Sequence, residues 1–113
     1  MPFSLRAFEE LSHTQLKPLP GLLPLLDTLD ASGVSHAIVT NAPATEMHHS
    51  LGVLKVKERF THLVPSEECT AGKPDPEPYL EGMRRLGVMA GEAIAVEDSP
   101  AGIRSAVAAV RRR

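Results

Sequence analysis

The stretch from Ala93 to Ile103 constrains the fold of this chain more than any other, because four small or branched apolar residues run directly into two adjacent carboxylates. The apolar residues do not alternate with polar ones, which is typical of a strand buried on both faces of a sheet. Ser99 then suits a helix N-cap, and Pro100 suits the first helical position. The pattern predicts that Glu97 and Asp98 lie at the carboxyl edge of a parallel strand, where open α/β sheets bind ligands.

Two carboxylates at such an edge, beside a helix N-terminus, most simply hold a hard cation such as Mg²⁺ through oxygen ligands. A second interpretation is an acidic loop tip that does no more than cap the helix. Taken alone, the stretch leaves both interpretations open.

Two other segments have the same strand-end character. Residues 37–41 read Ala-Ile-Val-Thr-Asn, and residues 71–79 read Ala-Gly-Lys-Pro-Asp-Pro-Glu-Pro-Tyr. Together they add a hydroxyl with a neighbouring backbone N–H, at Thr40 and Asn41, and a single lysine, Lys73. A hydroxyl, a lysine and an acidic pair are the groups needed to hold a phosphoryl group and its metal. A solvated loop lysine is the alternative for Lys73, but its place between the other two segments favours phosphate binding.

At these residues the sequence resembles the haloacid dehalogenase-like hydrolases, most of which are phosphatases or phosphomutases. Thr40 matches the second motif of that family, Lys73 the third, and Glu97 with Asp98 the fourth. The strings GKPDPEPYL and VEDSPAGI are most similar to the subgroup that contains β-phosphoglucomutase and small sugar-phosphate phosphatases. The resemblance covers roughly residues 17–110.

The resemblance implies a reaction on a small phosphorylated metabolite through an aspartyl-phosphate intermediate. It implies that the Thr40 hydroxyl and the Asn41 N–H bind phosphate oxygens, and that Lys73 offsets the charge of the phosphate and the nucleophile. It also implies that Asp98 coordinates Mg²⁺ and that Glu97 supports the metal site. Whether the product is a free phosphate or a phosphorylated sugar stays open.

The first motif of the family, Asp-x-Asp-x-Thr/Val, supplies the nucleophile and does not occur in this sequence. Asp27 and Asp30 are the only aspartates before Asp75, and their spacing predicts solvated positions on a helix face. One hypothesis is therefore that the chain is part of a phosphohydrolase, inactive by itself, whose N-terminal segment lies elsewhere. The alternative is a catalytically dead relative that binds a phosphorylated ligand or a protein partner. A third, that the motifs are structural only, we weigh least.

Composition narrows the functional class. The 113 residues carry a net charge of −2 and few aromatic side chains, which argues against nucleic-acid binding. No apolar stretch is long enough to span a bilayer, and the first ten residues lack the apolar segment of a signal peptide. Cys69 is the sole cysteine, so an internal disulfide is impossible and a reducing, cytoplasmic location is expected. The five histidines are expected on the surface.

The order of segments predicts an α/β fold, a truncated Rossmann-like core of three α/β/α layers with parallel strands. Residues 1–16 are interpreted as the remnant of a helical cap and residues 17–113 as a partial core domain. The expected strands cover residues 35–40, 62–65 and 93–97, and the expected helices include 22–31, 44–51 and a segment that ends before Gly87. In the family, a strand carrying the first motif separates the first and third of these strands. Without it, those two strands either leave a slot about one strand wide or pair directly, and we favour direct pairing if the chain folds alone.

Overall fold

The computed structural model describes residues 20–111. Its strands are β1 (Ala37–Val39) and β2 (His62–Val64), which pair in parallel with Ile38 opposite Leu63. Its helices are α2 (Leu22–Ala31), α3 (Ala44–Val53), α4 (Glu77–Leu86) and α5 (Pro100–Arg111). Short 3₁₀ turns occur at η1 (Lys57–Arg59), η2 (Ser66–Glu68) and η3 (Ala90–Glu92). Helices alternate with the two strands, as predicted for an α/β fold.

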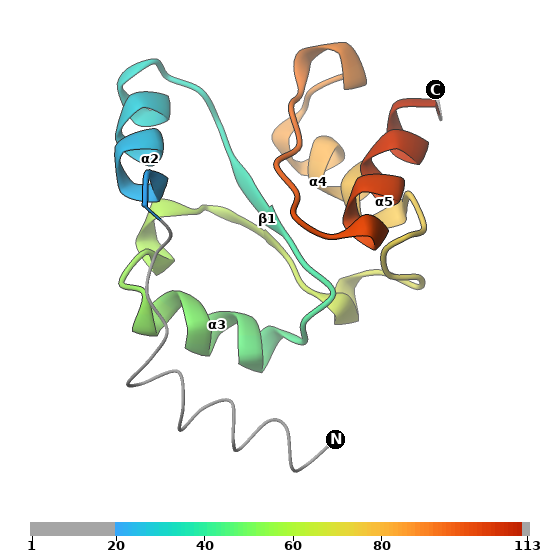
Figure 1. Ribbon diagram of the computed structural model, residues 1–113, viewed down its shortest axis with the longest axis horizontal. Coiled ribbons are helices and arrows are strands. Elements are labelled where there is room, and N and C mark those ends of the chain that lie inside the picture. Colours follow the sequence, from blue (N-terminus) through green and yellow to red (C-terminus); the bar gives the residue numbers. More distant parts are fainter. Residues whose placement is uncertain (1–19, 112–113) are drawn as a thin grey trace.

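The helices form a layer on each face of the strand pair (Figure 1). On the side of α2 and α3, Ile38 and Leu63 pack against a buried cluster of Leu26, Met47, Leu51 and Val56. On the other side α4 contacts both strands, and α5 packs on α4. Alternate strand residues thus serve opposite faces, as the twofold period of a strand requires. The α/β/α layering predicted from the sequence is confirmed.

Small residues are buried in both helices of this layer. Gly82 of α4 faces Val39 of β1, and Gly102, Ser105 and Ala109 are buried on α5. The hydroxyl of Ser105 donates a hydrogen bond to the carbonyl of Asp75 at 2.6 Å. This bond ties α5 to the loop that carries Lys73.

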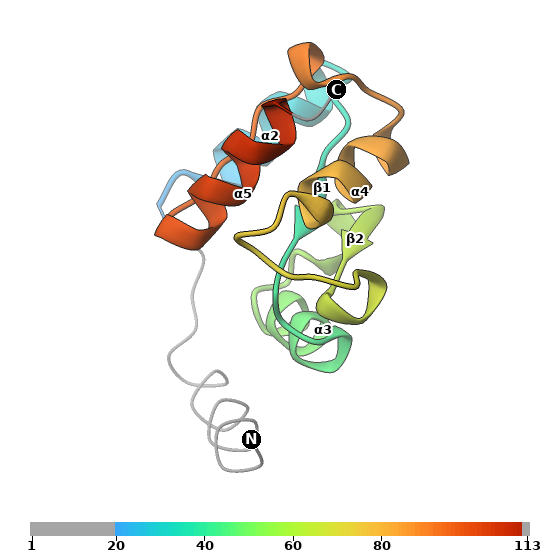
Figure 2. The ribbon, with the colours of Figure 1, turned by 90° about the vertical axis from the view of Figure 1, so that its right-hand side faces the viewer.

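The prediction of a third strand at residues 93–97 is wrong. That segment has no strand assignment, and within residues 20–111 the sheet has only two strands. Its apolar side chains are open to solvent, since Ile94 is 92% exposed and Val96 is 83% exposed. The segment runs beside β1 without pairing with it (Figures 1 and 2). The expected direct pairing of the two strands is therefore also wrong.

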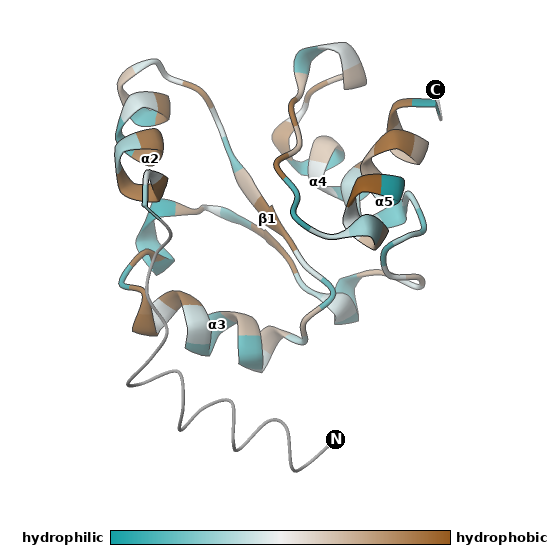
Figure 3. Ribbon diagram, viewed as in Figure 1, coloured by the Kyte–Doolittle hydropathy of each residue, from teal (hydrophilic) through white to brown (hydrophobic). Residues whose placement is uncertain are grey.

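The physical reason is that an apolar sequence favours burial but cannot supply a hydrogen-bonding neighbour. Figure 3 shows the apolar segment leading into α5 and turning hydrophilic at its end. On α5 itself the larger apolar residues, Ile103, Val107 and Val110, are about half exposed. Within residues 20–111, apolar side chains of residues 93–97 and of α5 therefore remain exposed to solvent.

The other predicted elements agree with the structure to within a few residues. Helix α2 has the predicted bounds, α3 continues two residues further than predicted, and both strands are shorter. Residues 1–16, interpreted as a cap remnant, lie outside the described residues, so that division of the chain stays a prediction. None of the helices within residues 20–111 is long and apolar enough to cross a membrane.

Candidate functional site

Lys73 joins the segments singled out in the sequence. Its ammonium group donates a hydrogen bond to the Val39 carbonyl, at the end of β1, at 2.9 Å. It also forms an ion pair with Glu97 Oε2 at 2.6 Å, and both side chains are only 11% exposed. The end of β1, the lysine loop and the acidic end of residues 93–97 therefore meet at one place. An ammonium has three N–H donors, so one is left for a further acceptor.

Asn41 fixes the backbone of the lysine loop. Its Oδ1 accepts the Lys73 N–H at 2.8 Å, and its Nδ2 donates to the Lys73 carbonyl at 3.2 Å. Gly72 makes this approach possible, because a Cβ there would lie 2.8 Å from Asn41 Oδ1. The role of the Asn41 side chain had no distinct signal in the sequence.

Thr40 lies between the two residues that contact Lys73. Its backbone N–H donates to the Val64 carbonyl at 3.1 Å, which extends the pairing of β1 with β2. Its hydroxyl oxygen accepts the Ala42 N–H at 3.0 Å, so the hydroxyl proton stays available for an outside acceptor. The Asn41 N–H makes no hydrogen bond within residues 20–111. Two free donors thus lie beside Lys73.

Glu97 is held on both of its carboxylate oxygens. Oε2 accepts from Lys73 and from the Tyr79 hydroxyl, each at 2.6 Å, and Oε1 accepts from the Asp98 N–H at 3.2 Å and the Ser99 hydroxyl at 3.3 Å. Burial alone would raise the pKa of Glu97, but the hydrogen bonds from Lys73 and Tyr79 outweigh it and lower that pKa to about 2. Burial, followed by the bond to Glu97, raises the pKa of Tyr79. Glu97 is therefore an ionised partner of Lys73.

Asp98 is exposed and follows Glu97 at the start of α5. Ser99 caps that helix as predicted, because its hydroxyl accepts the Gly102 N–H at 3.0 Å. Within residues 20–111 no three acidic, histidine or cysteine side chains gather in a way that could hold a metal ion. Mg²⁺ requires near-octahedral oxygen coordination, and Asp98 is the one carboxylate of the pair that makes no hydrogen bond or ion pair within residues 20–111. The described residues alone do not fit Mg²⁺, so the metal roles of Asp98 and Glu97 stay predictions.

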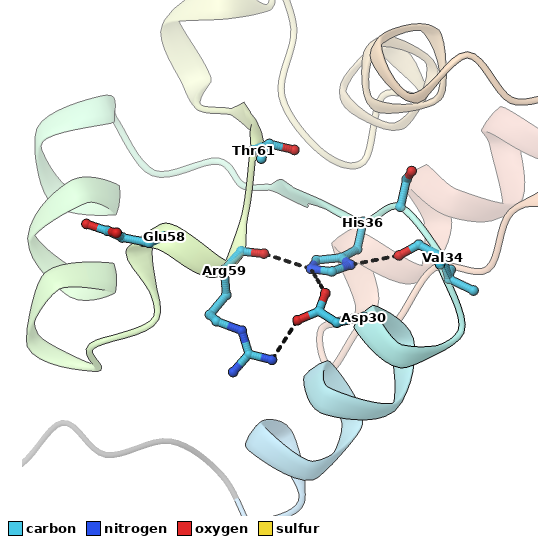
Figure 4. A pocket seen from close by; sticks show the side chains of 8 residues that line it. Asp30, Val34, His36, Glu58, Arg59 and Thr61 are labelled. Atoms are coloured by element: carbon cyan, nitrogen blue, oxygen red, sulfur yellow. Dashed lines mark hydrogen bonds and ion pairs between the residues drawn. The ribbon is translucent and has the colours of Figure 1, made fainter.

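A separate surface cavity of about 450 Å³ lies where β1 and β2 begin, at the opposite end from Lys73 (Figure 4). His36 Nε2 lies 2.8 Å from the Arg59 carbonyl, and Arg59 forms ion pairs with Asp27 and Asp30 at 2.8 Å. Both aspartates are substantially exposed, as predicted, but they are also paired. The His36 side chain is only 17% exposed, so its predicted surface position is wrong. These contacts tie α2 to the turn before β2.

The structure thus brings together all the segments predicted to form the site. Thr40, Asn41 and Lys73 lie at one end of β1, and Glu97 connects them to Asp98. Sequence reasoning missed the contact of Tyr79 with Glu97. It also missed Gly102, where a Cβ would lie 1.8 Å from the Glu97 Cδ atom.

Known proteins are similar to this chain over most of its length. Hexitol phosphatase A of Escherichia coli K12 is 36% identical over 110 residues, which cover 90% of this chain and 50% of that protein. A phosphorylated carbohydrates phosphatase of Thermotoga maritima is 33% identical over 104 residues, which cover 92% of this chain and 46% of that protein. The crystal structure of a hydrolase from Pseudomonas syringae matches with a TM-score of 0.86 at 28% identity, over 93% of this chain and 48% of the other.

The chain spans about half the length of the curated relatives that it matches. The sequence profile of one family, described as haloacid dehalogenase-like hydrolase, matches residues 1–112. This match covers nearly the whole sequence, and the relatives named above include two phosphatases of phosphorylated carbohydrates or hexitols. The chain therefore belongs to the haloacid dehalogenase-like hydrolases.

Proposed function

We propose that this chain is the phosphate-binding part of a phosphohydrolase that acts on a small phosphorylated metabolite through an aspartyl-phosphate. The observation that carries the proposal is the arrangement around Lys73. An ammonium N–H that Val39 and Glu97 leave unused, the Thr40 hydroxyl and the Asn41 N–H all belong to residues at or in contact with the carboxyl end of β1. These donors match the oxygens of a phosphoryl group, and a lysine beside them supplies charge-assisted binding. Phosphatase and phosphomutase activity both fit this arrangement.

The donors alone are insufficient for turnover. A lysine about 4 Å from a phosphate charge contributes roughly 4 kcal/mol at a protein surface, which is about three powers of ten in rate. Enzymes that hydrolyse phosphate monoesters provide up to about 10²¹-fold. The nucleophile must therefore come from elsewhere, because the sequence has no Asp-x-Asp motif. We propose that the chain by itself is inactive.

The exposed apolar side chains of residues 93–97 and α5 support the proposal that a further strand packs beside them in the complete enzyme. Leaving Ile94 and Val96 in water forgoes about 1.5 to 3 kcal/mol for each side chain. We propose that a strand carrying the nucleophile lies between β1 and this segment in the complete enzyme. Its carboxylates would join Asp98 and complete the oxygen ligands of Mg²⁺.

Phosphate binding tests the first part of the proposal. Inorganic phosphate is titrated into the full chain by calorimetry, with Lys73→Met and Thr40→Val as site variants. We expect at least about tenfold weaker binding in Lys73→Met, because the charge beside the phosphate is lost. Lys57→Met is the matched control, since Lys57 is exposed in η1, before the start of β2. Equal affinity in both lysine variants would contradict the site.

Activity tests the second part. The purified chain is incubated with a phosphate monoester and Mg²⁺, and release of phosphate is measured. We expect none above background. Turnover that survives purification to homogeneity and disappears in Asp98→Ala would overturn the proposal of inactivity and require another nucleophile. The coding sequence upstream of Met1 gives a separate check, because an in-frame Asp-x-Asp-x-Thr after an apolar run supports the missing strand over a catalytically dead binding protein.

A further inference from the structure

Tyr79 and Lys73 share one oxygen of Glu97. Both donors lie 2.6 Å from Oε2, and the Lys73 ammonium lies 5.1 Å from the centre of the Tyr79 ring. At this distance the ring face also attracts the cation. Tyr79 therefore contacts both members of the ion pair from helix α4, while the pair itself joins a loop to the segment before α5.

Glu97 is confined from its other side by the first turn of α5. A Cβ on Gly102 would lie 1.8 Å from Glu97 Cδ, so the carboxylate occupies the space that any side chain at position 102 would need. The Asp98 N–H and the Ser99 hydroxyl hold Oε1 in the same place. The Tyr79 hydroxyl and Lys73 are the side-chain donors to Oε2 within residues 20–111. Tyr79 therefore completes the contacts that hold the Glu97 carboxylate in place.

The orientation of the Lys73 ammonium group depends on the position of the Glu97 carboxylate. Two of its three N–H donors are used by Val39 and Glu97, and these two contacts fix where the third N–H points. Without the Tyr79 hydroxyl, Glu97 loses one of the bonds that hold Oε2 in place. Lys73 would then have one firm anchor, the Val39 carbonyl, and its free N–H would point in several directions.

We propose that Tyr79 is a positioning residue for phosphate binding, which holds Glu97 so that Lys73 keeps one N–H directed at the phosphoryl group. The inference rests on the proposed function for its consequence, but the positioning itself is a property of the folded chain. It assigns Glu97 to the lysine rather than to the metal, which leaves Asp98 as the carboxylate that faces outward. The hydroxyl of Tyr79 contacts no reacting atom.

The test compares the full chain with Tyr79→Phe, which removes only the hydroxyl and keeps the ring beneath Lys73. Two quantities are measured: the affinity for inorganic phosphate by calorimetry, and the ¹H–¹⁵N signal of the Lys73 ammonium by NMR at low temperature. We expect phosphate binding to weaken about five- to tenfold and the Lys73 signal to broaden or disappear. Thr28→Val is the matched control, because it removes a hydroxyl that bonds only within α2. Both quantities should stay unchanged in it.

A second variant keeps the inference testable if Tyr79→Phe does not fold. Gly102→Ala leaves Tyr79 and Lys73 intact but places a methyl group where the Glu97 carboxylate lies, so it should cause the same two losses. Retention of the Lys73 signal and of phosphate affinity within twofold, in a folded Tyr79→Phe or Gly102→Ala chain, overturns the inference. If the unaltered chain binds no phosphate, the proposed function fails, and the NMR signal alone still decides whether Tyr79 positions Lys73.

Discussion

The two sides of β1 differ sharply, although a segment with apolar residues runs along each of them. On one side β2 pairs with β1, and the layer formed by α2 and α3 buries Leu26 to 2% exposure. On the other side residues 93–97 run past β1 unpaired, with Ile94 92% exposed. The comparison teaches that apolar character marks a segment as suited to burial, while strand formation also requires a neighbour with free backbone groups.

The largest expected effect contrasts one residue from each side. Leu26→Ala should lower the free energy of unfolding by about 2 to 5 kcal/mol, because it opens a cavity in the closed core. Ile94→Ala should change it by no more than about 0.5 kcal/mol, because the side chain already lies in water. Urea unfolding of both variants followed by circular dichroism checks this. A comparable loss in Ile94→Ala would mean that residues 93–97 are packed in solution.

A pair of glycines gives the next contrast. In Gly82→Ala a Cβ would lie 2.9 Å from Val39 Cγ2, so α4 or the Val39 side chain must shift, at a cost of about 1 to 3 kcal/mol. In Gly52→Ala the Cβ meets nothing within 4 Å, and the helix propensity of alanine should stabilise the chain by about 0.5 to 1 kcal/mol. Thermal unfolding measures both. Stabilisation by both substitutions would show that α4 does not pack tightly on β1.

The elements that the sequence predicted correctly differ from residues 93–97 in one physical respect. Helix α2, the β1 and β2 strands and the Ser99 cap depend on local patterns and on neighbours within this chain, and they agree with the structure. Residues 93–97 have the same kind of pattern, but their expected neighbour is absent from the described residues. A sequence pattern records the environment for which a segment is suited, and it does not report whether that environment is present.

In the site, too, some features could be predicted from the sequence and others depend on how neighbouring segments are arranged. Lys73 could be placed beside Thr40 from the family resemblance of its motif together with the rule that parallel strands bring their carboxyl ends to one edge of a sheet. The contacts of Asn41, Tyr79 and Gly102 with the lysine and its partner could not be predicted in the same way. They depend on the angle at which the lysine loop and α5 approach β1, which no local pattern encodes.

Acid should weaken the ion pair between Lys73 and Glu97, which connects β1 to residues 93–97. The pKa of Glu97 is lowered from 4.5 to about 2 in the folded chain, so its contribution to stability is present above about pH 4.5 and is lost as the pH falls towards 2. Partial exposure and solvent screening reduce the loss to about 1 to 2 kcal/mol. Urea unfolding between pH 6 and 2.5 measures it. Glu97→Gln and Lys73→Met should each remove this part of the acid dependence, and an unchanged profile in both would contradict the assignment.

The smallest expected effect concerns two adjacent arginines on α4, of which one contacts β2. Arg85 bonds the Leu63 carbonyl of β2 at 2.6 Å and pairs with Glu81 and Glu68, whereas Arg84 pairs with Glu81 alone and is 71% exposed. Arg85→Lys keeps the charge but loses the planar fork that reaches three partners, so it should cost about 0.5 to 1 kcal/mol and lower the melting temperature by a few degrees. Arg84→Lys should leave that temperature unchanged. If the two substitutions behave alike in thermal unfolding, apolar packing holds α4 on β2 and Arg85 does not.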